Sequence, residues 1–229
     1  MIRAVSFDAA GTLFRVRGSV GAAYARIAAR HGVRAAPEDI ERRFRAAFRD
    51  MPPMCFPGVA AAEVAQHENR WWQQVVRAAF AGCRFDDFDA FFHELFAYFA
   101  RGSSWRVFPD ALPALQQLRQ EQLRLAIVSN FDRRLEPLCD ALGLRPHVDA
   151  IVRSTAVGAA KPDPRIFTIM LSQLGVAAAD CLHVGDSAAL DIAGAHAAGL
   201  RAVLIDRDQP SAWPDRIGDL RELAAHVDG

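Results

Sequence analysis

The alternation of short apolar runs with helical segments limits the fold of this chain more than any other feature of its sequence. Five apolar runs are predicted to form strands, at residues 2–7, 123–129, 149–152, 181–185 and 202–206. The segments between the later runs repeat apolar residues at helical spacing, at 110–120, 133–143, 163–175 and 191–199. Strands that alternate with helices predict an α/β fold with a parallel sheet covered by helices on both faces.

Residues 16–102 interrupt this alternation, because no strand pattern appears in them. Helical periodicity is found instead at residues 20–32, 68–80 and 88–100, and the proline-rich MPPMCFPG at 51–58 indicates a loop. We therefore expect a helical domain at 16–102, inserted into a core domain built from 1–15 and 103–229 and returning to cover the strand ends.

The composition argues against nucleic-acid and membrane partners. The formal net charge of the 229 residues is zero and no basic run exceeds two residues, so no patch is suited to phosphate backbones. No segment has the length and hydropathy of a membrane span or a signal peptide. The four cysteines are scattered, which suits a reducing compartment. We expect a cytoplasmic protein, with monomer and homodimer both open.

Carboxylates follow two of the predicted strands. Asp8 stands in FDAAGTLF, directly after the first strand, and Asp186 and Asp191 stand in VGDSAALD after the fourth. The carboxyl ends of parallel strands meet at one edge of a sheet, where such folds bind ligands. Two carboxylates that converge there repel each other unless a cation lies between them, and hard oxygen ligands favour Mg²⁺. Asp191 could equally be only a helix-start residue.

The single lysine of the chain is a second candidate site residue. Lys161, in GAAKPDP, is the only lysine beside 26 arginines. Lysine is a compact point charge, whereas arginine is a wide planar fork, so a confined position beside carboxylates and a phosphate would admit only lysine. A surface lysine without function is the plainer alternative.

Ser129 and Asn130 end the second predicted strand, in the sequence SNFD. Their hydroxyl and amide groups are suited to hydrogen-bonding phosphate oxygens. Taken alone, a Ser-Asn pair after a strand is also a common turn.

Together and in this order, four segments resemble the motifs of the haloacid dehalogenase-like (HAD) superfamily. They are FDAAGTLF, IVSN, AAKPDPRIF and HVGDSAALDIAGAHAAG. The resemblance spans the whole sheet domain, and the helical insert lies where the C1 cap of subfamily I lies. Within the superfamily the chain most resembles the REG-2-like branch, whose cap has a similar paired-tryptophan helix, here Trp71 and Trp72. The resemblance implies a Rossmann-like three-layer sandwich with an inserted α-helical cap. For the two tryptophans we expect packing within the cap rather than contact with substrate.

The resemblance also implies a hydrolase that uses Mg²⁺ on a small phosphorylated substrate. Asp8 would attack the phosphorus and form an aspartyl-phosphate. The metal ion would be held by Asp8, the main-chain carbonyl of Ala10 and Asp186.

The remaining site residues are assigned in the same way. Ser129, Asn130 and Lys161 would bind the substrate phosphate, and Ser129 and Lys161 would stabilise charge on the transferring oxygens. Thr12 and Asp191 would support the site from nearby.

Ala10 departs from the family pattern. Most family phosphatases carry an aspartate there, which protonates the leaving group and activates the hydrolytic water. We therefore expect turnover that is slow or selective for leaving groups that depart without a proton, such as aryl or acyl phosphates. Asp132, His67 and His93 are the residues that could replace the missing acid.

Three other functions would explain an alanine at this position, and the sequence excludes the first of them. Phosphonoacetaldehyde hydrolases need a cap lysine, and residues 16–102 contain none. The 2-haloacid dehalogenases use a motif similar to FDAAGTLF and no Mg²⁺, but they typically lack the Gly-Asp pair found here as Gly185 and Asp186. The third alternative is a non-catalytic or regulatory phosphate-binding protein.

Overall fold

The computed structural model describes residues 1–207 and 213–227. Within them, a six-stranded parallel sheet has the order β5-β4-β1-β6-β7-β8. Its strands are β1 (Ala4–Phe7), β4 (Arg124–Ser129), β5 (Ala150–Arg153), β6 (Cys181–Gly185), β7 (Arg201–Ile205) and β8 (Arg216–Ile217). The five predicted strands are thus confirmed, and the sheet is the α/β, Rossmann-like architecture expected from the sequence. The two-residue β8 was not predicted, because so short a segment has no readable alternation.

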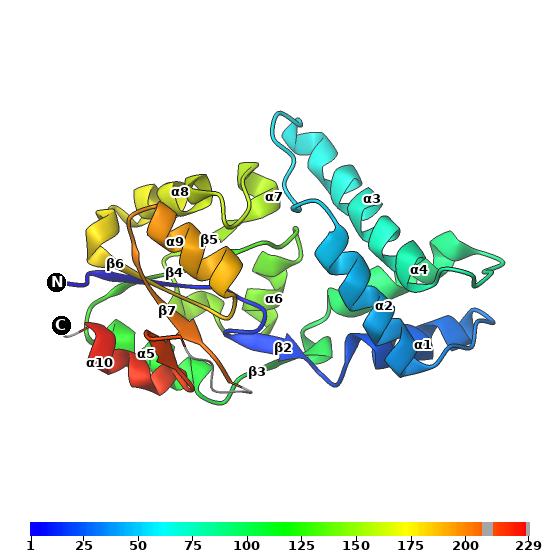
Figure 1. Cartoon of the computed structure of the whole chain (residues 1–229), viewed down its shortest axis with the longest axis horizontal. Coiled ribbons are helices and arrows are strands. Elements are labelled where there is room, and N and C mark those ends of the chain that lie inside the picture. Colours follow the sequence, from blue (N-terminus) through cyan, green and yellow to red (C-terminus); the bar gives the residue numbers. More distant parts are fainter. Residues whose placement is uncertain (208–212, 228–229) are drawn as a thin grey trace.

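Helices cover both faces of the sheet, and the alternation of β4 shows how (Figure 1). Leu125 and Ile127 lie in the core cluster formed with α5 (Ala111–Gln120), α6 (Leu135–Ala141) and α10 (Ala224–Val227). Ala126 and Val128 point to the other face and pack in the cluster formed with α8 (Pro164–Leu174) and α9 (Ala193–Ala197). The sheet is therefore buried on both sides, as the parallel strands require.

Short helical turns connect these elements. They are η1 (Gly102–Ser104), η2 (Arg145–His147), α7 (Ser154–Val157), η3 (Ala178–Asp180), the π-helical η4 (Ala188–Ile192) and η5 (Leu220–Leu223).

The helical insert lies between the strands of an antiparallel ribbon, β2 (Phe14–Val16) and β3 (Trp105–Val107). It contains α1 (Val20–Arg30), α2 (Pro37–Asp50), α3 (Ala61–Ala79) and α4 (Phe88–Phe99), which stand beside the sheet at the end opposite both termini (Figure 1). The sequence did not predict α2, since only Ile40 of its residues is buried and its many charges hide the apolar period. Helix α3 begins at Ala61, ahead of the expected start at residue 68.

A buried glutamate fastens the insert to the sheet domain. Glu68 on α3 is fully buried, and its carboxylate accepts hydrogen bonds from the Thr155 hydroxyl (2.6 Å) and from the main chain (3.1 Å) and guanidinium (2.5 Å) of Arg133. Arg133 follows β4 by four residues, so the insert is held close to the strand end that carries Ser129. No helix among the described residues combines the length and hydropathy needed to cross a membrane.

Candidate active site

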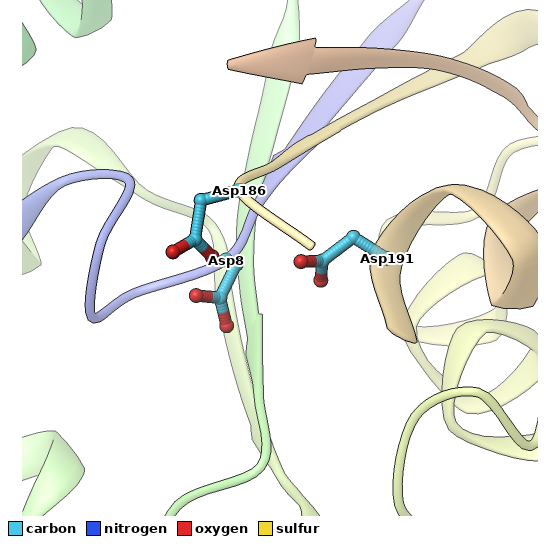
Figure 2. A group of neighbouring side chains, drawn as sticks. All are labelled: Asp8, Asp186 and Asp191. Atoms are coloured by element: carbon cyan, nitrogen blue, oxygen red, sulfur yellow. The ribbon is translucent and has the colours of Figure 1, made fainter. Parts of the chain in front are cut away.

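The register of the sheet brings the predicted residues together at one edge. Phe7 of β1 pairs with Ile127 of β4 and with Val184 of β6, so the residues that follow these three positions lie side by side at the carboxyl ends of the strands. Ser129 Oγ donates a hydrogen bond to Asp8 Oδ1 at 3.0 Å. Asp8, Asp186 and Asp191 gather at this edge, with Asp191 pointing toward the other two (Figure 2).

Lys161 lies at the centre of the group. Its side chain is 2% exposed, and its Nζ donates to Asp8 Oδ1 and to Asp191 Oδ1, each at 2.5 Å. Burial lowers the pKa of the ammonium, but the charges of Asp8 and Asp191 outweigh it and raise that pKa to about 12. The lysine therefore stays charged at neutral pH, and the alternative of a surface lysine is wrong.

Asn130 holds Lys161 in place through the main chain. Its amide group donates to the carbonyl oxygen of Lys161 (2.9 Å), and its amide oxygen accepts from the N–H of Lys161 (2.7 Å). Because both ends of the side chain are engaged in this way, the geometry favours a positioning role for Asn130 over the phosphate contact expected from the sequence.

Asp191 is a buried partner of the lysine rather than a helix cap. It lies within η4, where Ser187 supplies the cap by accepting from the N–H of Leu190 (3.2 Å). The second oxygen of Asp191 accepts from the N–H of Ser187 (3.0 Å). Burial raises the pKa of Asp191, but Lys161 and His183 outweigh it and hold that pKa well below its usual range.

Sequence reasoning missed His183, which completes the group behind Asp191. Its Nε2 lies 3.3 Å from Asp191 Oδ1, and its Nδ1 lies 2.9 Å from Ser6 Oγ, with the ring fully buried. Burial lowers the pKa of His183, so the ring is neutral and orients Asp191 without adding charge. The signal in the sequence was a polar residue inside the apolar run CLHVG.

The donor set fits a divalent cation. One carboxylate oxygen each from Asp8, Asp186 and Asp191 lies within 4.8 Å of the others. Desolvation in the cavity, followed by the charges of Asp8 and Asp191, raises the pKa of Asp186 to about 7. Burial and Asp191 likewise raise the pKa of Asp8, against the effect of Lys161. This excess of negative charge suits a hard cation. Since both oxygens of Asp191 are engaged, Asp8 and Asp186 are the side chains free to bind it.

Two glycines allow the loops of the site to approach this closely. A Cβ on Gly11 would lie 2.1 Å from Asp186 Oδ2, and the φ of Gly11 is +103°, which side-chain-bearing residues rarely adopt. A Cβ on Gly185 would lie 2.2 Å from Asp191 Cγ. The spacing between the carboxylates therefore depends on the absence of a side chain at both positions.

Thr12 supports the loop of Asp8 through its main chain. Its carbonyl accepts from Arg207 (2.7 Å), which also binds Asp110 at 2.9 Å. The Thr12 hydroxyl is buried and has no hydrogen-bond partner among the residues that the structure describes. Sequence reasoning missed Arg207 and Asp110, which lie far from Thr12 along the chain.

A cavity of about 620 Å³ opens in front of these residues. Ala10 lines it beside Asp8, and the insert supplies most of the opposite wall. The two tryptophans divide their roles. Trp71 packs within the insert and donates to the carbonyl of Pro52 (2.9 Å), whereas Trp72 lines the cavity. Both tryptophans pack within the insert as expected, and Trp72 in addition reaches the cavity.

None of the three residues considered as a substitute acid fits that role. Asp132 is fully buried and accepts from Arg134 Nε (2.8 Å) and Trp72 Nε1 (2.6 Å). Burial raises its pKa, but Arg134 and Trp72 outweigh this and hold the pKa of Asp132 below its usual range, so the carboxylate has no proton to donate at neutral pH. Within the described chain, neither His67 nor His93 lines the cavity.

The pair Asp132–Arg134 should contribute strongly to stability. We expect Asp132→Asn to lower the free energy of unfolding by about 3 kcal/mol at neutral pH, because Arg134 is 8% exposed and would lose its counter-charge. A depressed carboxyl pKa stabilises the fold above the unfolded pKa, and this contribution is lost as the pH falls through the folded pKa. The difference in the free energy of unfolding between wild type and variant, measured by urea unfolding, should therefore become smaller below about pH 4.

Asp219 offers a matched control. It binds Arg221 in the same two-residue arrangement, with its oxygens 2.8 Å from Nε and 2.6 Å from the terminal nitrogen, but that arginine is 67% exposed. Asp219→Asn should lower the free energy of unfolding much less than Asp132→Asn does. Equal losses for the two variants would show that burial of Arg134 does not matter.

Comparison with known proteins identifies the family. A family model described as haloacid dehalogenase-like hydrolase matches residues 2–199. Mouse haloacid dehalogenase-like hydrolase domain-containing protein 3 is 36% identical over 212 residues, which cover 91% of this chain and 84% of the relative. A phosphoserine phosphatase of Thermus thermophilus is 40% identical over 134 residues, covering 56% of this chain and 53% of that protein.

Among solved structures, the L-2-haloacid dehalogenase RSc1362 aligns over 100% of this chain and 99% of its own, with a TM-score of 0.75 and 25% identity. The relatives thus include proteins named for phosphatase and for dehalogenase activity. The family match, together with the four motif segments converging on one sheet edge, shows that the chain belongs to the haloacid dehalogenase-like hydrolase family.

Proposed function

We propose that the chain is a Mg²⁺-dependent phosphohydrolase of the cytoplasm that acts on a small phosphorylated metabolite. The observation that carries the proposal is the placement of Asp8, which shares Lys161 with Asp191 and lies beside Asp186 on one wall of the cavity. A nucleophile that removes a halide needs no second free carboxylate beside it. A site that binds a phosphate together with a divalent cation needs one, because the carboxylate binds the cation. The four cysteines are free thiols, which agrees with a reducing compartment.

In the proposed reaction Asp8 uses one carboxylate oxygen to attack phosphorus. The new P–O bond forms as the bond to the leaving oxygen breaks, and the electron pair departs with that oxygen. Water then attacks the phosphorus of the aspartyl-phosphate, which releases phosphate and restores Asp8. Ser129 and Lys161, both within hydrogen-bond reach of Asp8 Oδ1, stabilise the phosphoryl oxygens.

Asp8, Asp186 and the main chain of Ala10 would hold the metal ion, which supplies positive charge against the transferring oxygens. Because Ala10 provides no proton, the leaving group must depart as a stable anion or take its proton from water. The loss of general acid catalysis typically costs about 10² to 10⁴ in rate. Aryl and acyl phosphates should be affected least.

Two assays test the proposal together. Phosphate release from phenyl phosphate should require Mg²⁺ and disappear with a chelator. Halide release from 2-chloropropionate should be absent with or without the metal. The alternative of a 2-haloacid dehalogenase is favoured by Ala10 and by the likeness to a solved dehalogenase, and halide release would establish it. Phosphate binding without either product would support the regulatory alternative.

We expect Ala10→Asp to raise kcat/KM for alkyl phosphates more than for aryl phosphates. An alkoxide is a strong base and needs a proton as it leaves, whereas a phenolate does not, so an added acid helps the alkyl ester selectively. The site can present the new carboxyl group, because Ala10 lines the cavity beside Asp8. The measurement is kcat/KM for ethyl and phenyl phosphate in both proteins. Equal gains on both esters would contradict a role in leaving-group protonation.

A further inference from the structure

Beyond the phosphate site, the cavity is walled by aromatic side chains of the insert. Phe44 and Phe48 come from α2, Trp72 from α3, and Phe92 and Phe96 from α4. These rings touch one another: the centroid of Phe48 lies 5.7 Å from that of Phe44 and 5.9 Å from that of Trp72. An aromatic wall of this kind is suited to an apolar, flat ligand.

Of the charged side chains that line this part of the cavity, Arg134, Glu41 and Arg45 are paired, and the guanidinium of Arg15 lies 5.2 Å from the ring centroid of Phe108. Arg134 binds Asp132, and its guanidinium lies 3.9 Å from the ring centroid of Phe96. Glu41 accepts from the N–H of Gly21 (2.6 Å) and from Arg45 (2.8 Å). A sugar or a second phosphate would need free hydrogen-bonding groups here, and these contacts leave few of them.

Two apolar side chains on this cavity remain exposed. Phe48, from the insert, is 44% exposed and Leu190, from the sheet domain, is 40% exposed. Leu190 directly precedes Asp191, so it stands close to the reacting groups. Large apolar groups left in water on both sides of one cavity mark a surface that a ligand covers.

We propose that the substrate is the monophosphate ester of a bulky phenol, whose ring system covers Phe48 and Leu190. This inference rests on the proposed phosphohydrolase activity and specifies its substrate class. The cavity volume of about 620 Å³ accommodates a ring system larger than one benzene ring. Ala10 agrees with this class independently, because a phenol-type oxygen leaves as an anion without a catalytic acid.

The test separates the size of the ring from the ease of leaving. Phenyl phosphate and 2-naphthyl phosphate have leaving groups of similar acidity but different apolar area. We expect kcat/KM for the naphthyl ester to be at least about tenfold higher. Binding of phenylphosphonate and 2-naphthylphosphonate, which are not hydrolysed, is measured by calorimetry with Mg²⁺ present and should show the same order.

Variants assign the preference to the wall. Phe48→Ala and Leu190→Ala should each lower the naphthyl-to-phenyl ratio of kcat/KM by roughly threefold, because each removes apolar contact with the second ring. The two residues come from different parts of the fold, so poor folding of one variant leaves the other to decide. Trp213→Ala is the matched control, because Trp213 is 36% exposed but does not line the cavity. The ratio of kcat/KM for the two esters in this variant should equal that of the wild type.

The outcomes distinguish the inference from the function on which it rests. Phosphate release from both esters at equal efficiency, with equal phosphonate binding, would overturn the substrate class and leave the phosphohydrolase proposal standing. No phosphate release from either ester, with tighter binding of the naphthyl phosphonate, would overturn the activity and support the aromatic site. If Trp213→Ala lowers the naphthyl-to-phenyl ratio of kcat/KM as much as Phe48→Ala does, the preference cannot be assigned to this wall.

Discussion

Asp8→Asn is expected to abolish phosphate release while the fold is retained. An amide carries no negative charge with which to attack phosphorus, and it also weakens the binding of a cation. Activity should therefore fall by at least about 10⁴-fold. Stability should not fall with it. Burial, together with the charge of Asp191, raises the pKa of Asp8 against the effect of Lys161, and Asp191 remains to neutralise Lys161 in the variant.

The measurement pairs phosphate release with the midpoint of thermal unfolding. Asp219→Asn, which makes the same chemical change at the C-terminal η5 turn, should keep full activity. Turnover of Asp8→Asn near the wild-type rate would exclude Asp8 as the nucleophile. Loss of activity accompanied by a large drop in Tm would leave unfolding as the cause, and circular dichroism of the variant at the assay temperature settles that point.

Lys161→Arg is expected to damage the enzyme nearly as much as Lys161→Ala, with kcat/KM lowered by about 10²-fold or more in both. The ammonium reaches two carboxylates, each at 2.5 Å, from a position that is 2% exposed. A guanidinium is wider and presents its donors in a plane, so it cannot make both contacts in the same space. Lys161→Ala also leaves the buried carboxylates without their cation and should lose about 3–5 kcal/mol of stability.

Kinetics and urea unfolding of both variants test this expectation. The matched control is the reverse exchange at a surface position: Arg165 is 67% exposed, and Arg165→Lys should change neither activity nor stability. If Lys161→Arg restores most of the activity that Lys161→Ala loses, the shape of the cation is unimportant and charge alone explains the single lysine.

The sheet and the convergence of the site were predictable because they depend on local patterns. Apolar runs between helices define parallel strands, and Asp8, Ser129 and Asp186 follow the ends of strands that such a sheet places side by side. The roles of Asn130 and His183 were not predictable in the same way. Each depends on a partner at a distance that the sequence does not encode locally: the main chain of Lys161 for one, Asp191 and Ser6 for the other.

Neighbouring residues on a helix show the same limit. Trp71 and Trp72 are one residue apart, so on α3 they point in different directions, about 100° from each other. The sequence shows the pair but not the rotation of the helix about its axis, which places Trp71 in the insert and Trp72 on the cavity. Asp132 likewise looked like a free acid, because the sequence shows neither its ion pair with Arg134, two residues further on, nor its hydrogen bond from Trp72 of the insert.

The single lysine provides a chemical probe of how often the site opens. Reagents that acylate amines need a neutral amine that solvent can reach, and Lys161 is 2% exposed with its pKa raised to about 12. Apart from the terminal amine, the folded chain therefore offers such reagents no ready target, since all its other basic side chains are arginine or histidine. An acyl group that mass spectrometry finds at Lys161 must have entered while the site stood open. The rate of that single modification would report how often the site opens, and a bound phosphate analogue should slow it.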